Sequence, residues 1–142
     1  MISVRYEKVI AASPQQILTK LLDHGALSDL FNAKFNVIEP ANPTEIPGGK
    51  GCIRQVSVLG VRFLEQIIHA DTSSIEYRVL NDFPVKNHQG SIRFTPTSNG
   101  TSVHYTISCA APWFLPERLL TYLIQNDIKK CLDKLGVIYD PR

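Results

Sequence analysis

The second half of the chain is a run of strand-like segments closed by one long amphipathic segment. Short breaks separate the strands, and Asn99-Gly100 between the last two is the strongest hairpin signal in the chain. The five strand-like segments cover residues 51–59, 62–70, 74–80, 85–95 and 101–109. Consecutive strands joined by short turns pair in antiparallel fashion, so this half predicts an antiparallel sheet on which one helix packs.

The closing segment, residues 116–136, has apolar residues at helical spacing. They are Leu119, Leu120, Leu123, Ile124, Ile128, Cys131, Leu132 and Leu135. A helix of this length spans about 30 Å at 1.5 Å per residue. Asp127 projects inside the apolar stripe, about 40° from its centre at roughly 100° per residue. A carboxylate on a buried face needs a partner or water, which makes Asp127 unusual.

The first part of the chain supplies two more strands and two short helices. Residues 2–11 alternate as a strand does, and a further strand is expected near residues 35–39. Ser13-Pro14-Gln15-Gln16 between them predicts a helix start with reciprocal capping. A second short helix is expected over residues 26–31. The whole chain therefore predicts an α+β protein, a single domain over residues 1–142, with a seven-stranded curved sheet around the last helix.

Composition excludes several classes of protein. The net charge is only +2, and no basic stripe or reading motif for nucleic acid occurs. No apolar run is long enough for a membrane span, and the charged, alternating start does not read as a signal peptide. The three cysteines lie far apart, which favours free thiols in a reducing compartment and a cytoplasmic location. The four histidines show no ligand spacing, so we expect no metal and no cofactor.

Strand parity assigns an inner face to the sheet. Ile75, Tyr77 and Val79 share one face of their strand. Two further strands contribute His88, Gly90, Ile92, Phe94, Val103, Tyr105, Ile107 and Cys109. In the first two strands of the meander the pattern is mixed, so the direction of Arg54 and of Glu65, inward or outward, stays open.

The chain resembles the START-like (SRPBCC) superfamily, nearest the bacterial polyketide cyclase/dehydrase group. The residues that carry the resemblance are Ala12-Ser13-Pro14, Gly49 to Gly51, Arg54, Glu65, Tyr77, Val79, Gly90, Phe94, Pro96, Asn99-Gly100-Thr101, Val103 and Pro112. Ile17-Leu18 and Leu30-Phe31 stand where the family often has an aromatic residue, commonly Trp. The resemblance implies the helix-grip fold and a cavity between sheet and long helix that holds an apolar molecule. It does not imply one activity.

Three polar residues are candidates for chemistry. His88 is either a general acid or base or a histidine hydrogen-bonded within the sheet. Asp127 either orients a ligand hydroxyl or His88, or reaches solvent and pairs with a lysine. Arg54 either points inward to hold a carboxylate or enolate, or stands on the solvent face. Tyr77 and Tyr105 either donate hydrogen bonds from an apolar wall or pack as ordinary core residues.

The leading hypothesis is a protein, monomeric or homodimeric, that binds a hydrophobic small molecule such as a lipid or polyketide. The residues expected to line its cavity are Tyr77, Val79, His88, Ile92, Phe94, Val103, Tyr105, Ile107, Leu120, Ile124, Asp127 and Ile128. One alternative is a polyketide cyclase, aromatase or dehydratase that uses His88, Asp127 and Arg54. Another is a protein-interaction module that exposes Leu64 and Ile68.

Overall fold

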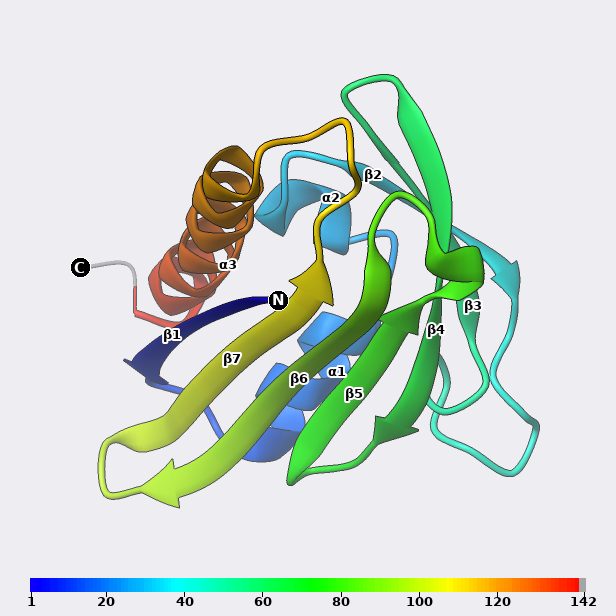
Figure 1. The fold of residues 1–142 in the computed structure, drawn as a ribbon. Helices are drawn as coiled ribbons and strands as arrows, with labels where there is room; N and C mark the ends of the chain where they lie inside the picture. The colour runs from blue at the N-terminus through cyan, green and yellow to red at the C-terminus, as the bar shows by residue number, and fades with distance from the viewer. Residues whose placement is uncertain (141–142) are drawn as a thin grey trace.

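The computed structural model describes residues 1–140, which form one seven-stranded antiparallel sheet with helices on one side (Figure 1). The strand order is β1-β7-β6-β5-β4-β3-β2. The strands are β1 Ile2–Ile10, β2 Lys34–Glu39, β3 Ile53–Val58, β4 Val61–Ala70, β5 Ser74–Val79, β6 Lys86–Thr97 and β7 Gly100–Ala110. The predicted sheet is therefore confirmed, and residues 141 and 142 lie outside the described part of the chain.

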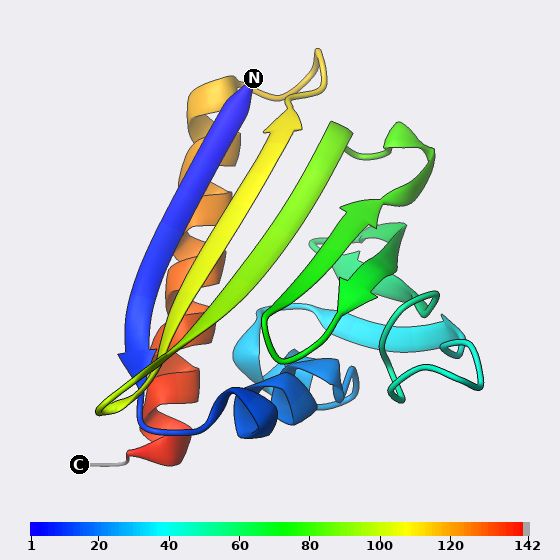
Figure 2. The same ribbon diagram turned by 90° about the horizontal axis from the view of Figure 1, so that it is seen from below.

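Three α-helices lie on the concave side of this sheet, and their places follow the predicted helix-grip arrangement. The helices are α1 Pro14–Leu22, α2 Leu27–Leu30 and α3 Glu117–Tyr139, and a 3-10 turn, η1, covers Leu80–Asp82. The long α3 runs alongside β1, while α1 and α2 connect β1 to β2, the two edge strands (Figure 2). The sheet thus curves around an interior that α3 closes from one side.

The start of α1 has the capping arrangement that its sequence predicts. The Oγ atom of Ser13 accepts from the backbone N–H of Gln16 at 3.2 Å, and the Gln16 Oε1 accepts from the N–H of Ser13 at 2.9 Å. Two backbone donors at the helix start are satisfied in this way. The apolar side of α1 then packs into the interior, where Ile17 and Leu18 are fully buried.

The buried face of α3 differs from the predicted stripe. Leu120, Ile128, Cys131, Leu132 and Leu135 are buried, but Leu119 is 46% exposed. At about 100° per residue, Leu119 lies on nearly the opposite side of the helix from the buried residues. Counting Leu119 among the buried residues shifts the predicted centre of the apolar stripe toward Asp127. Asp127 lies instead at the border of the buried face, about 75° from its centre, and is half-buried.

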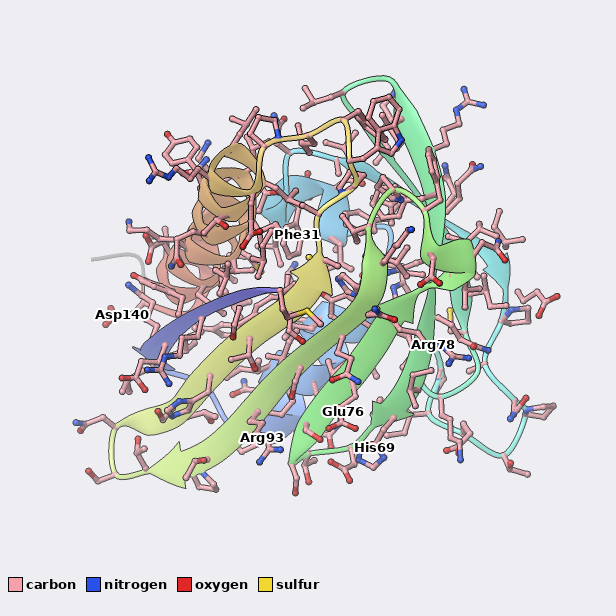
Figure 3. All side chains as sticks on the ribbon, viewed as in Figure 1. Phe31, His69, Glu76, Arg78, Arg93 and Asp140 are labelled. Atoms are coloured by element: carbon pink, nitrogen blue, oxygen red, sulfur yellow. The ribbon has the colours of Figure 1, made fainter. Side chains whose placement is uncertain are left out.

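Strand parity holds across the sheet. Inward-facing residues of β5, β6 and β7 are buried as predicted, and the two open directions are settled: Arg54 and Glu65 both face inward, 6% and 8% exposed. The outer face carries polar side chains, among them Glu76 and Arg93, which lie on the side away from α1 and α2 (Figure 3). Of the two residues expected on an interaction surface, Leu64 is half-buried and Ile68 is 39% exposed.

Candidate functional site

An ion pair lies inside the curved sheet, between neighbouring strands. Arg54 on β3 is paired in register with Glu65 on β4, so both side chains leave the same face side by side. The Nε and Nη2 atoms of Arg54 both donate to Glu65 Oε1, at 2.9 and 2.7 Å. Both side chains are buried, and at these distances each charge compensates the other.

His24 completes the hydrogen bonding of this pair from the loop after α1. Its Nδ1 accepts from Arg54 Nη1 at 3.0 Å, and its Nε2 lies 2.9 Å from the carbonyl oxygen of Gly48. A carbonyl can only accept, so Nε2 carries the proton and the imidazole is neutral. Burial, and then the Arg54 charge, lower the pKa of His24, which favours the same neutral form.

Gly48 is required at this contact. Its φ of +78° is in the left-handed region, and a Cβ atom there would lie 2.3 Å from the carbonyl oxygen of Leu22. The glycine-rich segment before β3 is therefore held against the end of α1 through His24. The histidine was not singled out by the sequence, because no spacing or periodicity connects it with Arg54.

Two aromatic rings enclose the Arg54 guanidinium. Its Cζ atom lies 5.1 Å from the ring centre of Phe35 and 5.1 Å from that of Tyr77. A cation against aromatic faces is stabilised by the ring quadrupoles, and here two rings contribute. The charge of Arg54 is thus already paired with Glu65 rather than left uncommitted for a ligand carboxylate or an enolate, the role predicted for it.

Tyr77 continues the cluster toward β7. Its hydroxyl is hydrogen-bonded to that of Tyr105, and both side chains are almost fully buried, 5% and 2% exposed. The Tyr77 ring lies against Gly90 of β6, where a Cβ atom would be 2.4 Å from the ring. Gly90 thus leaves the space that the ring occupies. Burial raises the pKa of both tyrosines, so both keep their protons at neutral pH.

His88 lies on the other side of Tyr77. The two ring centres are 5.5 Å apart, and His88 is 8% exposed. Its Nδ1 accepts from the backbone N–H of Val79 at 3.2 Å, so its proton is on Nε2. Burial is the main cause that lowers its pKa, and it is neutral at pH 7. His88 is hydrogen-bonded within the sheet and also adjoins the cluster.

Asp127, on α3, lies at the margin of this region. Burial raises the pKa of its carboxyl group, against the opposing effect of Lys130. Burial raises the pKa of Cys131, one turn further along α3, to about 12. Asp127 is half-buried near the edge of the interior, and within residues 1–140 no hydrogen bond or ion pair joins it to His88.

A pocket of about 730 Å³ lies between the diverging ends of β5 and β6. The two strands stop pairing after Tyr77 and Gly90. Beyond that point the Nδ1 atom of His88 on β6 accepts a hydrogen bond from the backbone N–H of Val79 on β5. Tyr77, Val79 and His88 line the pocket together with outward-facing residues such as Arg78 and Ser91. No residue of α3 lines it, so this pocket differs from the predicted cavity between sheet and helix.

The structure thus brings together four of the predicted polar residues, namely Arg54, Tyr77, Tyr105 and His88. It adds Glu65, His24 and Phe35 to them. The predicted apolar lining is closely packed, since Ile92, Phe94, Val103 and Ile128 are each 5% exposed or less. Burial loosens toward the start of α3, where Leu123 and Ile124 are only half-buried.

Comparison with known proteins agrees with this arrangement. Residues 1–136 match the family described as polyketide cyclase / dehydrase and lipid transport. The chain belongs to this family. Its members share the START-like fold that the resemblance predicted, and that prediction is confirmed. No curated protein sequence matches the chain.

Solved structures show the same fold at low sequence identity. A START superfamily protein from Mycobacterium smegmatis superposes with a TM-score of 0.78 at 12% identity, covering 98% of this chain and 97% of that one. Protein MLL2253 from Mesorhizobium loti gives 0.75 at 16%, covering 99% and 98%. The Aha1 dimer from Colwellia psychrerythraea gives 0.70 at 14%, covering 99% and 97%. No helix within residues 1–140 is long and apolar enough to cross a membrane.

Proposed function

We propose that this protein binds a small, mainly apolar molecule between the concave face of the sheet and α3. The observation that carries the proposal is the polar cluster of Arg54, Glu65, His24, Tyr77 and Tyr105 inside an otherwise apolar interior. Ligand sites combine apolar walls with a few placed polar groups in this way. The family description, which includes lipid transport, supports the same function.

The ligand would lie beneath the first half of α3. The inward-facing residues Ile128, Cys131, Leu132 and Leu135 are fully buried, whereas Leu123 and Ile124 are only half-buried. Side chains and ligand can therefore exchange places at Leu123 and Ile124 with the least loss of packing. The proposed lining is Tyr77, Val79, His88, Ile92, Phe94, Val103, Tyr105, Ile107, Leu120, Ile124, Asp127 and Ile128. A homodimer, known for the Colwellia protein, is a further proposal for this chain.

A binding titration with 1-N-phenylnaphthylamine, an apolar fluorescent probe, tests this site. We expect binding to the native protein and at least about a tenfold loss in Ile124→Trp, because an indole would fill the space beneath α3. Leu119→Trp is the matched control on the exposed side of the same helix and should bind as the native protein does. Absence of binding by the native protein, or equal affinity in Ile124→Trp, would contradict the proposal.

A second candidate function, catalysis of the cyclase or dehydratase type, is favoured by one observation. His88, a neutral imidazole with its proton on Nε2, lies against Tyr77 at the inner face of the sheet. An imidazole next to a phenol can move protons to and from a bound substrate. An enzyme of this type would bind its substrate in the same interior, so the binding measurement comes first for either function.

A further inference from the structure

The two buried tyrosines carry one more proton than their mutual hydrogen bond uses. Each phenol has one proton, and within the Tyr77–Tyr105 pair only one of the two can donate to the other oxygen. No other atom of residues 1–140 accepts a hydrogen bond from either hydroxyl. One phenolic O–H is therefore a buried donor without an acceptor in the protein, which is an unfavourable arrangement that a ligand oxygen would relieve.

The same interior has no net charge. Arg54 and Glu65 neutralise each other, and the hydrogen bonds of His24 and His88 require neutral imidazoles. The raised pKa values of the two tyrosines keep both phenols neutral as well. An anion placed there would meet no unpaired cation, and it would lie close to the carboxylate of Glu65. Burying such an anion without a partner is strongly unfavourable.

The tyrosine pair lies on the inner face of the sheet, near the end of α2. Tyr105 contacts the half-buried Phe31, whose ring centre is 6.4 Å away. This face of the sheet is the one that the proposed ligand would contact.

We infer that the ligand is an uncharged molecule with an oxygen acceptor, such as a ketone or an ester, and that free carboxylates are excluded. The inference rests on the proposed function, because it names the chemistry of the molecule bound in that interior. The tyrosine pair supplies the hydrogen bond to the oxygen. The paired Arg54 and Glu65 supply the charge neutrality that separates a neutral ligand from an acid of the same length.

Competition against the fluorescent probe at pH 8 tests this selectivity with 2-decanone and decanoate, which have the same number of carbons. We expect 2-decanone to bind at least about tenfold more tightly than decanoate, since the anion would be buried unpaired. The double variant Tyr77→Phe/Tyr105→Phe removes both phenols and with them the donor to the ketone oxygen. The double variant should lose roughly threefold to tenfold, the value of one hydrogen bond.

Two controls make the outcome decisive. The double variant should still bind the probe itself, which has no oxygen, and Tyr6→Phe, which removes a phenol from the surface contact with Asp133, should change nothing. Decanoate binding as tightly as 2-decanone would overturn the inference, and so would equal losses of probe and ketone in the double variant. If the native protein binds neither the probe nor the ketone, the proposed function itself fails.

Discussion

Arg54 is the residue on which the interior depends, because its charge is compensated by a single neighbour. Glu65 accepts two of its hydrogen bonds, His24 accepts a third, and the rings of Phe35 and Tyr77 lie against its guanidinium. A buried ion pair need not stabilise a fold more than apolar residues would, but removing one partner leaves the other charge without compensation. The contribution of the ion pair to stability is therefore measured by replacing one of its two residues.

Replacing Glu65 by Gln should destabilise the protein by about 3–5 kcal/mol, because the guanidinium stays buried and loses its counter-ion. Chemical denaturation measures the free energy of unfolding. Asp133→Asn is the control, since Asp133 pairs with Lys8 and Lys129 at the surface, where side chains are about one-third exposed or more. We expect that loss to stay below about 1 kcal/mol. Similar losses in the two variants would show that Glu65 does not balance a buried charge.

At the scale of the element, α3 combines a tightly packed second half with a carboxyl group at the border of its first half. Leu132 and Leu135 are fully buried, whereas Asp127 is half-buried and Leu119 is exposed. Burial raises the pKa of Asp127, which means that the folded state disfavours its ionised form. Removing the charge at this position should therefore favour the folded state.

Asp127→Asn should raise the melting temperature at pH 7 by about 1–3 °C, because the variant no longer places a charge in a partly desolvated position. The gain should disappear near pH 3, where the native carboxyl is protonated in both the folded and the unfolded protein. Asp133→Asn, six residues further along α3, should lower the melting temperature instead, since hydrogen bonds from Lys129 and Tyr6 lower the pKa of Asp133 despite partial burial. A stability loss in Asp127→Asn would contradict this assignment.

For the whole molecule, the two buried histidines connect stability to pH. Burial lowers the pKa of both His24 and His88 in the folded protein. Below about pH 6.5 an unfolded chain protonates these histidines while the folded chain does not. The unfolded state then binds more protons, so the free energy of unfolding falls as the pH falls.

Urea denaturation at pH 7.5 and at pH 5.5 measures this dependence, and we expect lower stability at pH 5.5. The double variant His24→Gln/His88→Gln should be less stable at both pH values but should lose most of the difference between them. His69→Gln/His104→Gln is the matched control, because these histidines lie at the surface beside Asp71 and Glu7. An unchanged pH difference in the first variant would show that other groups govern it.

Much of the fold followed from local patterns. Alternation along β5, β6 and β7 predicted which side chains are buried, and Ser13 and Gln16 predicted the start of α1. These patterns work because a strand presents alternate residues to one face and a helix start needs acceptors for its free N–H groups. Both rules act within a few residues, so they can be applied to the sequence without knowledge of the fold.

The candidate site could be predicted from the sequence only in part. Tyr77, Tyr105 and His88 could be placed on the inner face by parity, but the direction of Arg54 could not, because polar and apolar residues alternate weakly along β3 and β4. The partner of Arg54 on the loop after α1, His24, is 30 positions away in the sequence. The side of α3 that is buried was also misjudged by including Leu119.

By itself the sequence determined the seven strands, the long helix, the inner face of three strands and membership of a fold class. Only the tertiary structure decided that Arg54 is paired with Glu65, that His24 bonds to it, and that two tyrosines share a single hydrogen bond within a neutral interior. The physical reason is the distance along the chain over which each effect acts. Backbone geometry imposes its periods locally, whereas charge pairing and hydrogen-bond accounting depend on strand register and on segments that meet only when the chain is folded.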